Sequence, residues 1–162
     1  MSKPSSLGAL IAAALLGFSF LVVGKALAQQ SEVDKVKAAN DAYYAALSTR
    51  SIPAMEQVWA RTPRDVNIAP PIRPAAHVGW DTIRKNYQGF WGTLDELTVS
   101  MEKPTIEIRG SVAWVYGIEN VQRRDKKGQT SGGPNFGTSI FVKDGDRWLM
   151  VFHQAALIPQ PH

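Results

Sequence analysis

His153 and Gln154 are two adjacent polar side chains near the end of a long apolar run, residues 147–157. Histidine changes its charge near neutral pH, so His153 is the first candidate for proton-transfer chemistry. Successive strand residues face opposite sides, so only one of the two points inward unless a bulge intervenes. We expect His153 to be catalytic or to line a pocket, and Gln154 to bind a ligand. The alternatives for His153 are a structural histidine at the strand end and one at a dimer interface.

Two further candidates share one face of a predicted helix that begins near Ser31. The residues on this face recur at spacings of three and four, which is the helical period: Val33, Val36, Asn40, Tyr43 and Leu47. A buried amide needs hydrogen-bond partners, so Asn40 contacts either the sheet or a ligand. Tyr43 is the second catalytic candidate, and its structural alternative is a core aromatic.

Three more residues are expected to bind a ligand. Asn67 lies in a short predicted strand, His77 lies in the loop that follows, and Trp80 begins the next predicted helix. The alternative for His77 is a solvent-exposed loop histidine. Glu107 and Glu119 lie in predicted strands, but the sequence leaves open which way each one points. A site of paired carboxylates requires two inward-facing acids within reach of each other.

The order of predicted elements is helix, helix, strand, helix and then several antiparallel strands. The first two helices cover residues 31–47 and 51–59, and the third follows Gly79. The predicted strands cover residues 66–69, 96–101, 106–109, 112–121, 136–142 and 147–157, with loops at residues 72–78 and 128–137. Asp144 and Gly145 are typical of a hairpin turn between the last two strands. Helices gathered early and strands gathered late predict an α+β fold in which one curved sheet wraps around a long helix.

The N-terminal segment has the pattern of a secretory signal peptide. Lys3 precedes an apolar run, residues 7–23, and Ala26-Leu27-Ala28 forms an Ala-x-Ala cleavage site. We therefore expect residues 1–28 to be a signal peptide and residues 29–162 to form one domain. The domain is expected to be periplasmic or secreted and to have no stable membrane association after cleavage. The alternative is an uncleaved N-terminal anchor.

Composition narrows the classes of partner. The chain has no cysteine, so no disulfide contributes to its stability. Sixteen basic residues remain after residue 28 against fourteen acidic ones, a net charge of +2. The basic cluster at residues 123–127 precedes a glycine and is typical of a solvated hairpin tip, so we expect no nucleic-acid binding. Clustered histidine ligands are missing, so we expect no metal, and no cofactor is predicted.

Several segments together resemble the SnoaL-like, ketosteroid-isomerase-like branch of the nuclear-transport-factor-2-like superfamily. The resemblance covers nearly all of residues 32–159, and its motifs are residues 55–60, 65–66, Pro70, 79–83, 90–91, 113–115 and 148–154. It implies a cone-shaped, strongly curved, mostly antiparallel sheet wrapped around three N-terminal helices, commonly as a homodimer. It also implies a pocket between the sheet and the helices. A shared fold does not fix the chemistry.

The chain departs from this family at its polar positions. Ketosteroid isomerases carry a general-base Asp near the end of the first strand, where this chain reads Asn67-Ile68-Ala69-Pro70. Many SnoaL-like relatives have a His just before the Pro, where this chain has Ala69. Tyr43 is similar in position to the phenol that ketosteroid isomerases use to bind an oxyanion.

Three functions remain open from the sequence. The first is an exported protein that binds a small, mostly apolar molecule in a pocket, without chemistry. The second is an isomerase, dehydratase or hydrolase that uses His153 and Tyr43 as acid and base groups. The third is a dimerising interaction module whose cavity is filled by aromatic side chains. In the first two cases the partner is a small molecule, and a homodimer is expected.

Overall fold

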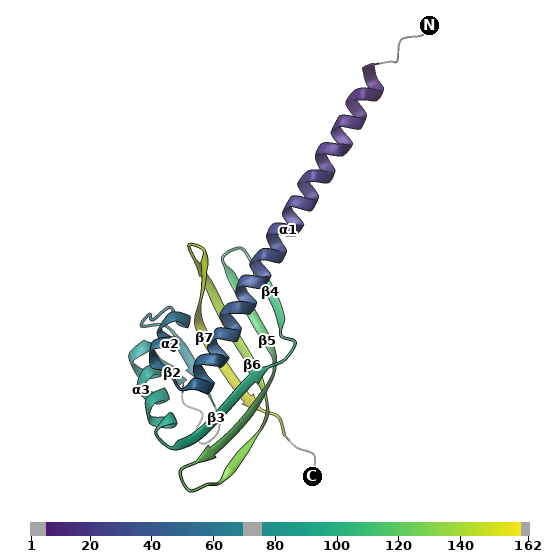
Figure 1. Ribbon diagram of the computed structural model, residues 1–162. Helices are drawn as coiled ribbons and strands as arrows, with labels where there is room; N and C mark the ends of the chain where they lie inside the picture. The colour runs from purple at the N-terminus through teal and green to yellow at the C-terminus, as the bar shows by residue number, and fades with distance from the viewer. Residues whose placement is uncertain (1–5, 70–75, 160–162) are drawn as a thin grey trace. The chain divides into compact units, whose positions relative to one another are not determined.

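The computed structural model describes the backbone of residues 6–69 and 76–159, and the side chains of residues 28–69 and 76–159. The chain divides into two compact units, Met1–Asp34 and Lys35–His162, and the second contains the site described below. The elements, labelled in Figure 1, are α1 (Ser6–Thr49), α2 (Ile52–Val58), β1 (Val66–Ile68), β2 (Ala76–Val78), α3 (Trp80–Trp91), β3 (Leu94–Met101), β4 (Thr105–Arg109), β5 (Val112–Asp125), β6 (Thr130–Asp144) and β7 (Arg147–Leu157). Among the described residues, no helix has the length and hydrophobicity needed to span a membrane.

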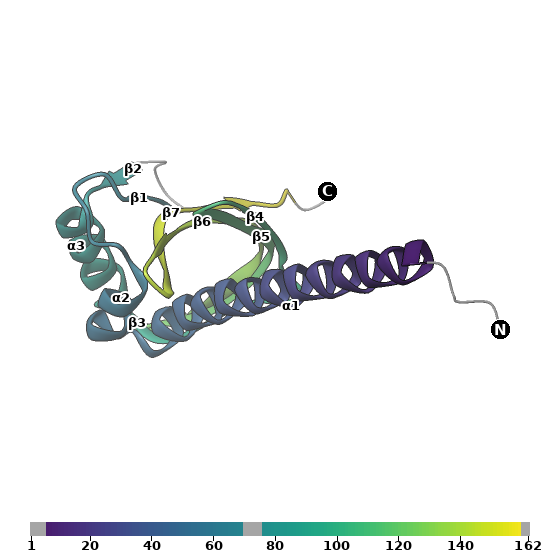
Figure 2. The ribbon, with the colours of Figure 1, turned by 90° about the horizontal axis from the view of Figure 1, so that it is seen from above.

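A single seven-stranded sheet forms the main layer of the second unit. Its strand order is β2-β1-β7-β6-β5-β3, and β4 also pairs with β5. The strands pair antiparallel except β1 and β7, which run parallel. The sheet is strongly curved over the C-terminal part of α1, and it does not close (Figure 2). The predicted α+β class, with a curved and mostly antiparallel sheet around three helices, is confirmed.

β7 is interrupted by a β-bulge that changes which of its residues face inward. Ile140 of β6 pairs with Phe152, whereas Phe141 pairs with Met150, so Val151 is the extra residue. Before the bulge Trp148 and Met150 are buried, and after it the buried positions are odd-numbered. An extra residue shifts the alternation by one, so the bulge decides which side chains at the end of β7 enter the interior.

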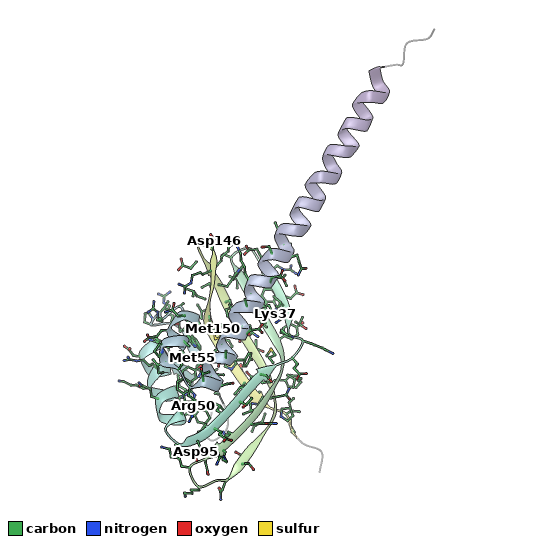
Figure 3. All side chains as sticks on the ribbon, in the orientation of Figure 1. Lys37, Arg50, Met55, Asp95, Asp146 and Met150 are labelled. Atoms are coloured by element: carbon green, nitrogen blue, oxygen red, sulfur yellow. The ribbon has the colours of Figure 1, made fainter. Side chains whose placement is uncertain are left out.

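The helices pack against the inner face of the sheet. Ser51 caps α2, its hydroxyl accepting a hydrogen bond from the backbone N–H of Ala54. Arg50, labelled in Figure 3, follows α1. Its Nη1 donates to the carbonyl of Leu94 at 2.7 Å. Met55 of α2 and Met150 of β7 are both fully buried, within one core that also includes residues of α1, α3 and the inner sheet face.

Three predicted element boundaries are wrong. The first helix does not begin near Ser31, because α1 is continuous from Ser6 to Thr49. Residues 76–78 of the predicted loop form β2, which pairs with β1, and residues 72–75 lie outside the described part of the chain. The predicted loop at residues 128–137 is largely strand, since β6 begins at Thr130 and pairs with β5 over its whole Gly-rich part. Backbone pairing there outweighs the low strand propensity of glycine.

Candidate functional site

Four polar side chains form one row across the inner face of the sheet. His77 of β2 pairs with Asn67 of β1, which pairs with His153 of β7, which pairs with Ser139 of β6. Residues directly opposite each other on neighbouring strands project to the same face. Asn67 and Ser139 are fully buried, His153 is 2% exposed, and His77 at the sheet edge is partly exposed.

Glu119 of β5 reaches this row and contacts His153. Its Oε1 lies 3.3 Å from Nε2 of His153, and the carboxylate is as deeply buried as the imidazole. The hydroxyl of Tyr44 donates to the same Oε1 at 2.7 Å. On the other side of the ring, Nδ1 lies 3.1 Å from the hydroxyl oxygen of Ser139. The imidazole is therefore held at both nitrogens, and we call Glu119 and His153 the dyad.

Gly137 gives the Glu119 side chain its path to His153. Glu119 pairs with Asn135 on β6, and Gly137 lies between Asn135 and Ser139 on the same strand. A Cβ at Gly137 would lie 2.5 Å from Cγ and 2.7 Å from Cδ of Glu119. The Glu119 side chain thus crosses β6 over the space where any other residue would place its side chain.

Two tyrosines of α1 have separate roles beside the dyad. Tyr44 donates to Glu119, whereas the hydroxyl of Tyr43 lies 3.2 Å from that of Tyr87 on α3. The ring centroid of Tyr43 lies 4.7 Å from that of His153. Burial raises the pKa of Tyr43 and of Tyr44, so both phenols stay protonated and available as hydrogen-bond donors.

Burial shifts the pKa values of Glu119 and His153 in opposite directions, and in each case toward the neutral form. Burial raises the pKa of Glu119 to about 7, although hydrogen bonds from Tyr44 and Asn135 lower it, and burial lowers the pKa of His153 to about 3. When Glu119 is protonated, it can donate to Nε2 while Nδ1–H donates to Ser139. When Glu119 is ionised, Nε2–H donates to the carboxylate and Ser139 donates to Nδ1. Ser139 can serve both tautomers because a hydroxyl both donates and accepts.

The dyad lies on the wall of a cavity of about 560 Å³. The polar part of the lining includes Tyr43, Asn67, His77, Asn86, Tyr87, Glu119, Arg123, Ser131, Asn135 and His153. The apolar part includes Leu47, Ala69, Phe90, Leu97, Val99, Val121, Ala155 and Leu157. A mostly apolar cavity with a few convergent polar groups is the usual form of a small-molecule site.

Four of the seven residues predicted for the site lie in this cavity: Tyr43, Asn67, His77 and His153. Gln154 is exposed and does not line the cavity, so the structure does not bring it together with the other predicted site residues. The bulge at Val151 is the reason: without it the inward series of Trp148 and Met150 would continue through Gln154.

The other two predicted residues also lie outside the cavity lining. Trp80 is partly buried against the core, with its ring centroid 6.5 Å from that of Trp59. Asn40 is fully buried on α1, and neither atom of its amide has a hydrogen-bond partner within the described ranges. The structure therefore places Trp80 against the core and Asn40 within it, and brings neither to the cavity lining.

Glu119 is the site residue that the sequence did not select. One signal was available, because Glu119 alternates in phase with Ala113, Val115 and Val121, and the first two of these are fully buried. No group of three or more His, Cys, Asp or Glu side chains that suits a metal ion occurs within residues 28–69 and 76–159.

The chain matches a known protein family in sequence and several solved structures in fold. A family model described as a SnoaL-like domain matches residues 36–160. No curated protein sequence matches the chain significantly.

Solved structures with a similar fold include an NTF2-like superfamily protein from Salmonella enterica serovar Typhimurium, with a TM-score of 0.75 and 16% identity over 83% of this chain and 96% of the other. A ketosteroid isomerase-like protein from Erwinia carotovora atroseptica has a TM-score of 0.66 and 19% identity over 79% and 98%. The association domain of C. elegans CaMKII has a TM-score of 0.59 and 16% identity over 80% and 96%. These likenesses establish the fold alone.

Gly137→Ala should disrupt the dyad. Its methyl group would overlap the Glu119 side chain and lie 2.8 Å from Cε of Met101. We expect a loss of about 1–3 kcal/mol in the free energy of unfolding, the usual cost of overpacking, measured by urea denaturation. Gly89→Ala is the control, because a Cβ there meets nothing within 4 Å and lies in helix α3. If both variants are equally stable, Glu119 does not occupy the space above Gly137.

Glu119→Gln should change how stability depends on pH. The ordinary pKa of a glutamate side chain is 4.5, whereas burial raises the pKa of Glu119 to about 7 in the folded protein. An acid whose pKa is raised by folding binds more protons in the folded state, so its contribution to stability falls as pH rises between these values. The variant should therefore gain about 3 kcal/mol relative to the wild type from pH 4.5 to above pH 7.

The measurement is urea denaturation of both proteins at several pH values. His153 contributes with the opposite sign, because its pKa is lowered by folding, and stability is lost as pH falls from about 6.5 toward 3. That contribution is present in both proteins and largely cancels in the difference. A difference that stays constant with pH would contradict the raised pKa of Glu119.

Proposed function

Because the chain belongs to the SnoaL-like domain family, we propose that its cavity binds a small, mostly apolar molecule and that the dyad transfers a proton on that molecule. The observation that carries the proposal is the buried contact between Glu119 and His153, at 3.3 Å, on the wall of an apolar cavity. A general acid or base works best when its pKa lies near the working pH, and the pKa of Glu119 is about 7.

The proposed chemistry uses the two protonation states of the dyad in turn. In the ionised state, the dyad removes a proton from a carbon next to a carbonyl group, and the C–H electron pair moves onto the carbonyl oxygen. Tyr43 stays protonated, because burial raises its pKa, and donates a hydrogen bond to that oxygen. The protonated dyad then returns the proton to a different carbon, which is an isomerisation, or to a departing hydroxyl group, which is a dehydration.

Asn67 is the proposed anchor for the polar group of the ligand. Its side chain is fully buried and lines the cavity, and neither amide atom has a hydrogen-bond partner among the described residues. A buried amide without partners costs stability, which a bound ligand with its own donor or acceptor would recover. The same feature suits a protein that binds the ligand without chemistry, so the experiment must separate binding from turnover.

The test follows proton exchange directly, which does not require knowledge of the natural substrate. A set of apolar cyclic ketones, with 2-tetralone as the first, is incubated in heavy water, and deuterium entry at the α-carbon is followed by NMR. Glu119→Gln and His153→Ala should each slow exchange by about 10²–10⁴-fold. Calorimetry should show that both variants still bind the ketone.

Gln154→Ala is the matched control, since Gln154 is the sequence neighbour of His153 but lies outside the cavity lining. It should leave exchange unchanged. Ketone binding without exchange above the buffer rate would contradict catalysis and leave a binding protein. The absence of binding by every ketone would count against the pocket function for this class of ligand.

We also propose that the chain forms a homodimer through the outer face of the sheet. Phe136 of β6 is 59% exposed, and its direct partner on β5, Ile118, is 37% exposed. Tyr116, on the same face of β5, is 44% exposed. Contiguous exposed apolar groups mark interaction sites, and a second copy offers the same patch through a two-fold axis. The similarity of fold to an association domain supports this choice of partner.

We also propose that the chain is exported. The apolar run at residues 7–23 and the Ala-x-Ala site ending at Ala28 support cleavage that releases a domain beginning at Gln29. The released domain would then be periplasmic or secreted.

Native mass spectrometry of protein from the producing cells tests dimerisation and export together. We expect twice the mass of a chain that begins at Gln29. Phe136→Lys should shift the species to the monomer, because a charge would be buried in the interface, whereas Gln129→Lys at the exposed hairpin turn should remain a dimer. A monomeric wild type would contradict the interface, and a chain that retains residues 1–28 would contradict cleavage.

A further inference from the structure

The inner face of β5 carries a second charged residue of the cavity. Glu119, Val121 and Arg123 are alternate residues of β5, and all three line the cavity. A strand rises about 3.3 Å per residue, so the backbone positions of Glu119 and Arg123 are about 13 Å apart. The cavity thus has the dyad toward one end and a guanidinium toward the other.

Arg123 is held by neighbours that leave part of its guanidinium available. Its Nε donates to the hydroxyl of Ser131, its direct partner on β6, at 2.8 Å. The central carbon of the guanidinium lies 6.0 Å from the ring centroid of Phe90 on α3. These contacts orient the side chain, while the Nη donors have no hydrogen-bond acceptor within the described ranges.

Arg124, the next residue on β5, differs from Arg123 in having a carboxylate partner. Arg124 points to the opposite face and forms an ion pair with Glu96 of β3. Arg123 has no such carboxylate partner among the described residues, and the acid on its own face, Glu119, is already bonded to Tyr44 and His153. A partly buried guanidinium beside apolar side chains is an effective receptor for an anion, and its planar fork matches a carboxylate.

We propose that the cavity takes an elongated, mostly apolar carboxylic acid whose carboxylate binds Arg123 at the cavity mouth. We place the mouth here because Arg123 and the lining residues Asn86, Phe90 and Ser131 beside it are partly or fully exposed. The apolar body lies along Leu97, Val99 and Val121, and the reacting end lies at the dyad and Asn67. This assignment rests on the proposed function, since it names the substrate class of the same cavity.

The experiment compares two ligands that share the same apolar carbon chain, one of which ends in a carboxylate and the other in an uncharged hydroxyl group. Decanoate and decan-1-ol are titrated into the full-length protein by calorimetry at neutral pH. The wild type should bind decanoate more tightly than decan-1-ol. Arg123→Gln should weaken decanoate binding about tenfold or more, the usual effect of losing a charged hydrogen bond, and should leave decan-1-ol binding unchanged.

Two further variants make the result specific to Arg123. Arg124→Gln removes the same charge from the neighbouring residue and should leave both affinities unchanged, and Arg123→Lys should retain part of the preference for decanoate. Thermal unfolding confirms that each variant is folded. Unchanged decanoate binding in Arg123→Gln, or an equal loss in Arg124→Gln, overturns the assignment but not the pocket function. Failure of both probes to bind the wild type overturns this assignment and counts against the pocket function as well.

Discussion

The buried contact between Glu119 and His153 is the constraint around which the second unit is arranged. An ionised carboxylate in an apolar interior costs several kcal/mol unless other groups bond to it. Here the hydroxyl of Tyr44 on α1 donates a hydrogen bond to the carboxylate. The hydroxyl of Ser139 on β6 is hydrogen-bonded to Nδ1 of the imidazole. The network therefore joins a helix to β5, β6 and β7, and removing any one member leaves another polar group buried without its partner.

Two local irregularities bring the dyad together. A bulge at Val151 turns His153 to the inside of β7, and the missing side chain at Gly137 lets Glu119 cross the intervening strand. A bulge weakens strand pairing and a glycine weakens a strand interior, so each would be unfavourable in a sheet that served packing alone. Both occur within a few residues of the same contact, where they aim one side chain and make room for the other.

The sequence was sufficient to predict the class of fold and to select His153, which lines the cavity, but it did not identify the side chain that contacts His153. Alternating and helical patterns predicted the elements, because burial imposes those periods on apolar residues. The direction of His153 depended on a bulge, and Trp148, Met150 and Phe152 alternate as though none were present. Glu119 shares the alternation of the buried Ala113 and Val115, but the partners that bond to its carboxylate lie on α1 and β7, far away in the sequence. Glycine and serine composition suggested a loop where pairing with β5 and β7 makes a strand.

Asp65 and Glu119 are both buried acids, but their surroundings differ. Asp65 is fully buried, and its oxygens accept hydrogen bonds from the backbone N–H and the hydroxyl of Thr62, three residues away. It closes a local turn and does not line the cavity. Glu119 instead faces an open cavity, takes partners from distant elements, and contacts the row that contains Asn67, whose amide has no partner among the described residues. Departures from good packing that converge on one cavity wall are better explained by ligand chemistry than by stability, since each of them lowers stability on its own.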